Sequence, residues 1–457
     1  MRLTRRQALA GAAAGALGAA GIYELVDRLA GDGGGAETLR RSVGRMGAEQ
    51  HSLGLAVVVE NGVEVVVPPR HHRLVTAKIA APDPRKAARE LEDALVALEQ
   101  RFDPTTPAGL GVTIGWGLPY FRDHVAAQSK VHLPFDRRAR KPALLDAIRF
   151  PSDPAETILE DNDVAVLLRA DARAHVVAGA TVLFGDLDIF SVTSIREGFA
   201  GGGLPKRMAL AANVPGADLI PDGAQLFLGF TSTQKDGLGP NRIANFETLG
   251  YVDLGPRGYF RNGTHMHVSH LFEDLEAWYL NFDFHERVDT AFRPGLEVKP
   301  GTQTVRQGRQ DVARTAQVER DFRDRGRIGH SSAIQTASRL QQDVVADDGM
   351  VFRRGTAIPQ RADFNTLDNP FSWSADPERD GIADVPSAGV HFVVFNPSSD
   401  DFHRNRLAMD GRLPDGTKLP LRPRARGQGF NAVLRTTHRQ NFLVPPRRRR
   451  SFPLAEL

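Results

Sequence analysis

The chain of 457 residues is too long for one minimal domain, and its hydrophobic share of 41% is enough for a substantial buried core. Two packed units are therefore expected. Its 58 basic and 55 acidic residues nearly cancel, and the formal charge of +3 gives no reason to expect a nucleic-acid partner. Cysteine is absent, which excludes disulfides, cysteine nucleophiles and thiolate ligation of any metal.

The N-terminus has the pattern of an export signal. Arg5 and Arg6 stand directly before a run of alanine and glycine from about Ala8 to Ala20, the order typical of a twin-arginine signal. Residues 1–35 are therefore predicted to be signal and linker. The twin-arginine translocase would export the folded protein to the periplasm, the cell surface or the medium. A membrane-anchoring or disordered basic terminus is the alternative, although the apolar run is too weak for a stable span of ~20 residues.

The elements that follow predict a first ferredoxin-like domain over residues 70–215. Two valine-rich runs flank the turn dipeptide Asn61-Gly62, which indicates a hairpin before that domain. The segment HRLVTAKIAA alternates as a strand does, and Asp83-Pro84 then supplies the N-cap and first-turn proline of a helix. One face of that helix is apolar, with Leu91, Leu95, Leu98 and Phe102 at helical spacing.

Later segments complete this domain and indicate a second. Residues 109–117 and 163–170 read as strands, and an apolar helical segment follows, giving the order strand, helix, strand, strand, helix, strand. Residues 222–446 again mix strands and helices with antiparallel connections, so the predicted fold class is α+β, with two ferredoxin-like domains and antiparallel sheets. The arginine-rich end, residues 447–457, is predicted to be a solvated basic tail.

Several segments, taken in order, resemble the dye-decolorizing peroxidase family of haem enzymes. GTHMHVSHLFEDLEAWYL resembles the strand and helix that follow that family's Gly-Asp-Gly region. GHSSAIQ, GMVFRRGTAIP and GVHFVVFNPSSDDFHRNRLAMDG resemble its proximal-histidine, distal-arginine and closing strand–helix segments. The resemblance covers residues 70–446. It implies two ferredoxin-like halves of the dimeric α/β-barrel type, with haem b bound in the second half.

The resemblance also assigns candidate site residues. His330 of GHSSAIQTA matches the family's proximal histidine, which implies an axial ligand to the haem iron; such a ligand is a neutral imidazole on an apolar wall. The other interpretation is that His330 only begins a helix. Arg353 matches the distal arginine and Gly355 the third position of its R-x-G pattern, so both are expected at the cofactor. A cation beside bound peroxide stabilises the charge that develops as the O–O bond breaks. A strand end with two solvated arginines, Arg353 and Arg354, is the alternative.

The family's distal acid lies in a G-x-x-D-G loop, from which LGFTSTQKDGLGP departs. In one alignment, Thr233 stands where the first glycine belongs. In the other, Gly229-Phe230 and the Lys-Asp-Gly that follows both match the family, and four extra residues, Thr231 to Gln234, separate them. With either alignment Asp236 is the candidate proton carrier and, with Arg353, the predicted catalytic pair. A plain Lys-Asp-Gly turn is the alternative.

Two functional hypotheses follow. The first is an exported haem-dependent peroxidase that oxidises a small reducing substrate with hydrogen peroxide. The second, suggested by the altered G-x-x-D-G loop, is a non-catalytic extracytoplasmic protein that binds haem or a metal.

A metal site has its own candidate residues. His265 and His267 would share one face of a strand, close to His270, and Glu273 or Asp274 would complete a zinc or copper site. The segment GFAGGGLPKR lacks the Walker and Rossmann patterns, so it is expected to be a loop over the haem edge or a surface turn.

Overall fold

The first half of the chain folds in the predicted order of strand, helix, strand, strand, helix, strand, and the second half mixes strands and helices with antiparallel pairing, as predicted. The computed structural model describes residues 16–30, 47–50, 56–60, 63–230, 258–296, 313–345, 351–369, 386–421 and 428–457. The first half consists of β3 (His71–Ile79), α3 (Pro84–Arg101), β4 (Gly111–Gly117), β8 (Val164–Ala170), α6 (Arg173–Ala180) and β9 (Phe190–Phe199). The main elements of the second half are β10 (Thr264–Glu273), α8 (Leu275–Leu280), α9 (Phe284–Ala291), α10 (Thr315–Arg325), α11 (His330–Ser338), β13 (Gln360–Arg361), β14 (Phe364–Thr366), β15 (Gly389–Asn396), α13 (Ser399–Met409) and β16 (Leu434–Val444).

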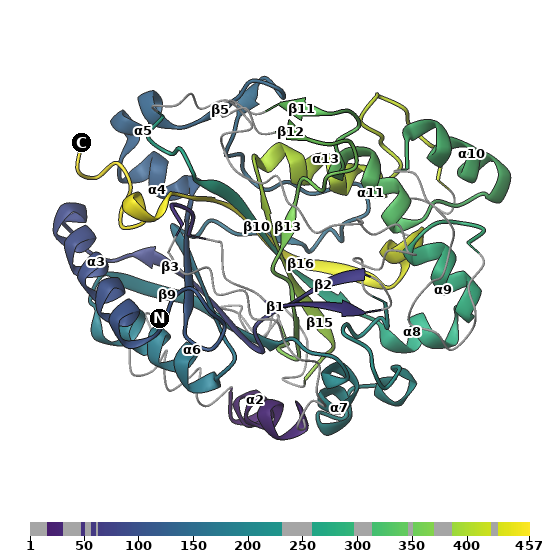
Figure 1. Cartoon of the computed structure of the whole chain (residues 1–457), viewed down its shortest axis with the longest axis horizontal. Coiled ribbons are helices and arrows are strands. Elements are labelled where there is room, and N and C mark those ends of the chain that lie inside the picture. The colour runs from purple at the N-terminus through teal and green to yellow at the C-terminus, as the bar shows by residue number, and fades with distance from the viewer. Residues whose placement is uncertain are drawn as a thin grey trace.

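The two halves share one sheet instead of forming separate domains. Its strand order is β10-β15-β14-β9-β3-β8-β4-β16, and β16 also pairs antiparallel with β10 from Thr264 to Glu273. The described strands therefore close into a ring, joined between halves where β14 meets β9 and β16 meets β4. Figure 1 shows α3 and α6 on one side of this sheet and α8 to α11 on the other. Closure leaves few free strand edges, so the ranges 70–215 and 222–446 are two halves of one unit.

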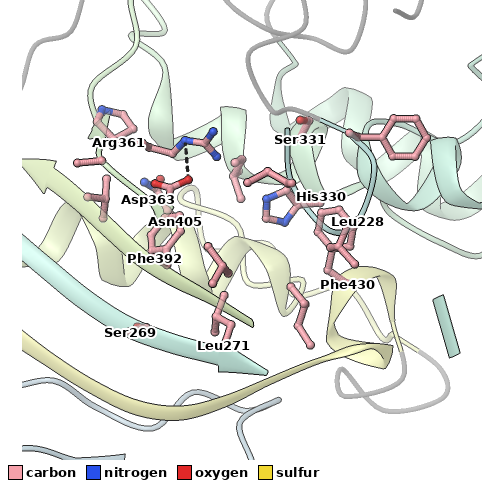
Figure 2. Close-up of a pocket in the computed structure, with 18 of the residues that line it drawn as sticks. Leu228, Ser269, Leu271, His330, Ser331, Arg361, Asp363, Phe392, Asn405 and Phe430 are labelled. Atoms are coloured by element: carbon pink, nitrogen blue, oxygen red, sulfur yellow. Dashed lines mark ion pairs between the residues drawn. The ribbon is translucent and has the colours of Figure 1, made fainter. Parts of the chain in front are cut away.

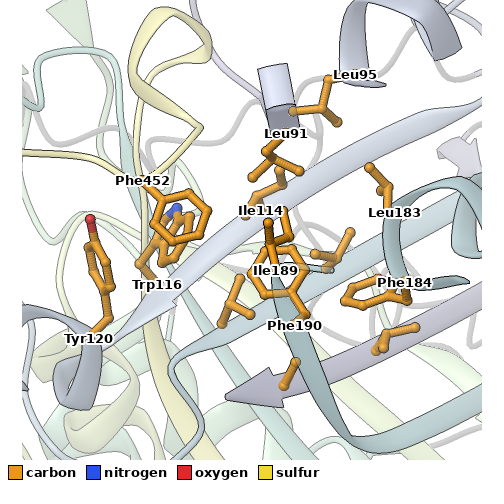
Figure 3. Close-up of a cluster of buried hydrophobic side chains, with 14 of the residues drawn as sticks. Leu91, Leu95, Ile114, Trp116, Tyr120, Leu183, Phe184, Ile189, Phe190 and Phe452 are labelled. Carbon is orange, nitrogen blue, oxygen red and sulfur yellow. The ribbon is translucent and has the colours of Figure 1, made fainter. Parts of the chain in front are cut away.

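Alternating strand residues build a core on each face of the sheet. The inner face holds a cluster drawn from both halves, including Leu74, Leu167, Met266, Phe395 and Phe442. On the outer face of the first half, α3 and α6 cover a second cluster (Figure 3). The predicted α3 is confirmed: the Asp83 side chain accepts hydrogen bonds from the first-turn amides, and Leu91, Leu95 and Leu98 are buried.

The segment expected to be signal and linker contains a helix that is part of the fold. In α2 (Ala16–Ala30), Ile22, Tyr23 and Val26 are buried in the second-half core. The Tyr23 hydroxyl donates to Asp368 at 2.9 Å and accepts from the Leu367 amide at 2.9 Å. Residues 16–30 are therefore not simple linker, because apolar and hydrogen-bonded contacts hold them. Arg5 and Arg6 lie outside the described residues. Among the described helices, none is long and apolar enough to cross a membrane.

The predicted solvated tail is wrong, because residues 447–457 pack against the first half. Phe452 and Leu454 are fully buried in the first-half core. The Trp116 indole donates to the Arg450 carbonyl at 2.9 Å, and the Tyr120 hydroxyl donates to the Pro453 carbonyl at 2.7 Å. Arg450 binds Glu92 and Glu99 of α3. Arg447 and Arg450 hold the segment in place because Glu92 and Glu99 of α3 neutralise them, which the local sequence does not reveal.

Short elements connect these parts. The predicted hairpin is confirmed in its strands, which pair antiparallel up to Glu60 and Val63; its turn residues Asn61 and Gly62 lie outside the described part of the chain. The remaining short elements are β1 (Ala56–Glu60), β2 (Val63–Val67), α4 (Leu118–Asp123), α5 (Ala126–His132), β5 (Phe135–Asp136), β6 (Lys141–Pro142), β7 (Ile158–Leu159), a π-helical turn (Thr181–Asp186), α7 (Leu204–Ala211), β11 (Val344–Val345), β12 (Val351–Phe352) and 3₁₀ turns at Ala217–Leu219, Gly429–Ala432 and Arg447–Arg449.

Candidate functional site

A cavity of about 470 Å³ lies between the outer face of the second-half sheet and the helices α11 and α13. Alternate residues of β10 and β15 form its floor, and Figure 2 shows Leu271 and Phe392 there with Leu228 and Phe430 at one side. The volume falls within the range of roughly 300–1,000 Å³ usual for cofactor and ligand sites. The walls are largely apolar, and the polar groups they carry identify the candidate site.

His330 is the first residue of α11 and faces this cavity (Figure 2). The preceding Gly329 allows this start, because a Cβ there would meet the Phe292 carbonyl oxygen at 2.3 Å. The imidazole lies 4.7 Å, between ring centroids, from Phe430. Burial, reinforced by the charges of Arg361 and Arg406, lowers the pKa of His330 to about 3. His330 both begins a helix and presents a neutral imidazole to the cavity, the form that ligates a metal.

Arg361 and Asp363 face the same cavity from the strand opposite (Figure 2). They lie two residues apart where β13 leads into β14, so their side chains share a face while Ala362 points to the inner core. The Arg361 Nε and an Asp363 carboxylate oxygen are 3.5 Å apart. Burial raises the pKa of Asp363, with Arg361 opposing that shift. A half-buried cation and an acid whose pKa is raised above its ordinary value thus stand together near a neutral imidazole.

Further arginines line the cavity. Arg406 and Arg439 both bind Asp153, at 3.3 Å and 2.8 Å, which balances part of their charge. Arg339 is different, since its Nη1 has no hydrogen-bond partner among the described residues and burial lowers its pKa to about 10. The cavity therefore offers Arg339 and Arg361 to an anionic group of a ligand.

The structure does not bring Arg353 and Gly355 to His330, contrary to the expectation from sequence. The Arg353 side chain is 75% exposed and donates to Asp343 at 2.6 Å. Neither Arg353 nor Arg354 lines the cavity. Gly355, at φ 87°, forms a turn in which its amide donates to the Leu340 carbonyl. The physical reason is that β12 pairs only with β11, a two-residue strand outside the main sheet, so it ends at the surface.

Asp236 lies outside the described residues, so its position stays a prediction. The described chain reaches Phe230, which lines the cavity, immediately before that segment. The glycine-rich segment after β9 is better defined. Ala200, Gly201 and Gly202 line the cavity, which matches the expected loop over a ligand.

The alternative metal site on β10 has no support in the described residues. His265 and His267 do share a face, but the His265 Nδ1 bonds to the Pro397 carbonyl and the His267 Nδ1 to the Asn441 side chain. His270 faces the opposite side and bonds to Thr437. In the described part of the chain, no three His, Asp or Glu side chains are placed to hold a metal ion.

Solved structures of DyP-type peroxidases have this fold. The DyP-type peroxidase from Cellulomonas bogoriensis matches with a TM-score of 0.50 and 18% identity, covering 85% of this chain and 92% of that one. A candidate DyP-type peroxidase protein from Shewanella oneidensis matches with a TM-score of 0.50 and 11% identity, covering 85% and 95%. The class defined by the fold is thus that of the DyP-type, two-half α+β proteins.

Within this class, the chain belongs to DUF7405, a family of unknown function whose model matches residues 69–446. No curated protein matches the chain.

Proposed function

We propose that this protein is a haem-dependent peroxidase that uses hydrogen peroxide to oxidise a small organic reductant. The observation that carries the proposal is one cavity with a neutral histidine, His330, and an opposed arginine–acid pair, Arg361 and Asp363. The DyP-type fold supports it, because solved neighbours with this architecture are peroxidases.

The residues that line the cavity fit a haem. Its walls are apolar, and several buried polar atoms there have no partner among the described residues, including His330 Nδ1, Arg339 Nη1 and Asp363 Oδ1. Buried polar atoms without partners are costly, so a site that contains several is built for a ligand. His330 would supply the axial ligand, and Arg339 would pair with a carboxylate of the haem.

Haem, when bound, supplies the redox-active iron, and the chain supplies charge and proton control. The Arg361 guanidinium would stabilise the negative charge that develops on peroxide oxygen as the O–O bond breaks. A carboxyl group would carry the proton between the two peroxide oxygens. Asp236 is the candidate for this role from the sequence, and Asp363 is the candidate on the cavity wall. The apolar wall strengthens both effects by excluding water.

The first test is haem binding. Addition of haem should produce a Soret band, and His330→Ala should weaken haem binding while the far-ultraviolet circular dichroism is kept. His285→Ala, on the exposed surface of α9, is the matched control and should leave the affinity unchanged. A His330→Ala protein that binds haem with the parent spectrum and affinity would refute the ligand assignment.

The second test separates the two candidate arginines. Arg361→Leu should slow the peroxide-dependent spectral change by ~10²- to 10³-fold, the usual loss for a group that stabilises developing charge. Arg353→Leu, which removes an exposed cation, should stay within twofold of the parent. The reverse pattern would restore the sequence-based assignment. If the reaction proceeds and neither variant, nor Asp236→Asn or Asp363→Asn, changes it, the proposed residue roles are wrong. If haem binds and the parent shows no peroxide-dependent spectral change, the protein is a haem-binding protein and not a peroxidase.

Export through the twin-arginine translocase is part of the proposal and rests on Arg5, Arg6 and the apolar run after them. Since Ile22, Tyr23 and Val26 are core residues, removal of a signal would have to cut before Ile22 to leave the fold intact. Small residues, Gly18 to Gly21, stand directly before that point.

A further inference from the structure

Glu273 is a buried acid of the cavity that the proposed mechanism does not use. It is the last residue of β10, is 5% exposed and lines the cavity. Its Oε2 has no hydrogen-bond partner among the described residues. In the strand register it is opposite Leu434 of β16, and Leu271 and Val390 share its face of the sheet. One carboxylate oxygen is thus held in an apolar corner.

This corner is remote from the arginines. The Glu273 amide bonds to the Ala388 carbonyl, whereas Arg361 pairs with Val394, six residues further along β15. At ~3.3 Å per residue, this difference corresponds to ~20 Å along the strand. Burial alone raises the pKa of Glu273 to about 8, so no cation among the described residues compensates its charge.

The other titratable groups around the cavity do not neutralise Glu273. Tyr279 of α8 feels its charge, but its hydroxyl donates to the Phe227 carbonyl at 2.6 Å. His330 on α11 is neutral, and Asp363 forms an ion pair with Arg361. The missing partner of Glu273 therefore has to come from a ligand.

We propose that Glu273 binds the ammonium group of an organic amine whose apolar body lies along Leu271, Val390 and Leu434. This deepens the proposed function, on which it rests, by naming organic reductants that carry an ammonium group as the substrate class. A buried acid without a partner is destabilising, and an ammonium supplies both the opposite charge and hydrogen-bond donors.

Binding has a defined proton balance. Near pH 6.5 Glu273 is protonated in the free protein, since its pKa is about 8. An ammonium ion that binds it favours the carboxylate, so the carboxylic acid proton leaves to solvent while the N–H bonds of the ammonium stay intact. About one proton is released for each amine bound, and amine affinity rises with pH up to about 8.

The test compares benzylamine, protonated at pH 6.5, with uncharged benzyl alcohol. Titration calorimetry in two buffers of different ionisation enthalpy measures affinity and proton release, on the protein as purified and after haem is added. The parent should prefer benzylamine and release about one proton. Glu273→Gln keeps the shape and removes the charge, and it should lose the preference by ~10- to 100-fold, as for a hydrogen bond to a charged group. Glu276→Gln removes an exposed acid three residues away and should behave as the parent.

The outcomes separate this site from the haem proposal. Glu273-dependent benzylamine binding in a protein that binds no haem would support the amine site and refute the peroxidase. Haem binding together with equal benzylamine affinity in the parent and Glu273→Gln would refute the amine site alone. Absence of benzylamine binding in both forms, or binding without proton release, would also overturn it.

Discussion

Lowering the pH from 7 to 5 should unfold the haem-free protein, because its interior holds neutral histidines. Besides His71, which pairs with Asp27, and His330 in the cavity, six described side chains have burial as the main cause of a pKa below the ordinary 6.5: His72, His265, His267, His270, His391 and His403. The pKa of His265 and of His403 is lowered to about 4. Above pH 6.5 both folded and unfolded chains carry these rings uncharged, so they do not change stability. Below pH 6.5 the unfolded chain binds protons that the folded chain refuses, so stability falls with pH.

The magnitude follows from the pH difference. One pH unit is worth about 1.4 kcal/mol for each proton, so at pH 5 a buried ring whose pKa is about 4 costs about 2 kcal/mol. His265 and His403 together therefore cost about 4 kcal/mol, and the other four rings add to this loss, while the raised pKa of Glu273 and of Asp368 offsets part of it. Native proteins are stable by about 5–15 kcal/mol, so the loss is expected to bring the unfolding transition toward pH 5.

Near-ultraviolet circular dichroism and potentiometric titration, on haem-free protein, measure the transition and its proton uptake. The expected net uptake on unfolding is several protons, because the buried rings outnumber the acids with a raised pKa, Glu273, Asp363 and Asp368, which release protons. His72→Phe is the informative variant, since the His72 ring stacks on Phe364 at 4.8 Å and neither ring nitrogen has a partner in the described structure. It should be more stable than the parent by a larger margin at pH 5 than at pH 7, because phenylalanine has no ring that the unfolded chain can protonate. A native spectrum that persists to pH 4, or an uptake of one proton or fewer, would refute the reasoning.

Three further predictions test features outside the cavity. Tyr23→Phe should cost about 1–3 kcal/mol in urea denaturation because it leaves the Leu367 amide and Asp368 without their hydroxyl partner; an unchanged midpoint would mean that α2 is not docked. Phe452→Ala should cost about 3–5 kcal/mol in the same assay because its ring is fully buried, and a loss below 1 kcal/mol would restore the solvated tail. Replacing Arg5 and Arg6 by lysine should keep folded protein in the cytoplasm, measured by cell fractionation, and normal export would remove the signal assignment.

The local sequence pattern was sufficient to predict the elements whose formation depends on residues within a few positions of each other. The alternation in β3 and the Asp83-capped, leucine-faced α3 were predicted from sequence and confirmed, because caps and periodic apolar residues act within a few positions. The order of the segments also predicted the two-half α+β fold. Closure of the ring by β16 was not predicted, since it depends on pairing with β4 and β10, which lie far away in the sequence.

The candidate site was predicted only in part, because its arginine is positioned by strand pairing between residues that are distant in the sequence. His330 faces the cavity as expected, but the arginine opposite it is Arg361 and not Arg353. The local signal for Arg361 is its alternation with Asp363 around the apolar Ala362. That pattern becomes decisive only when β13 and β14 are known to pair with β15, whereas Arg353 follows a strand that joins no large sheet.

The position of β16 has a consequence for how the protein is made. The first-half sheet is bordered by a strand from the extreme C-terminus, and Phe452 and Leu454 cover its core. About 250 residues separate the end of β9 from the last residue, so at ~5–20 residues per second the ribosome needs roughly 10–50 s to deliver the missing pieces. During that interval the nascent first half exposes Trp116 and its neighbours. The first half therefore cannot complete its sheet and its core before β16 and Phe452 have been synthesised.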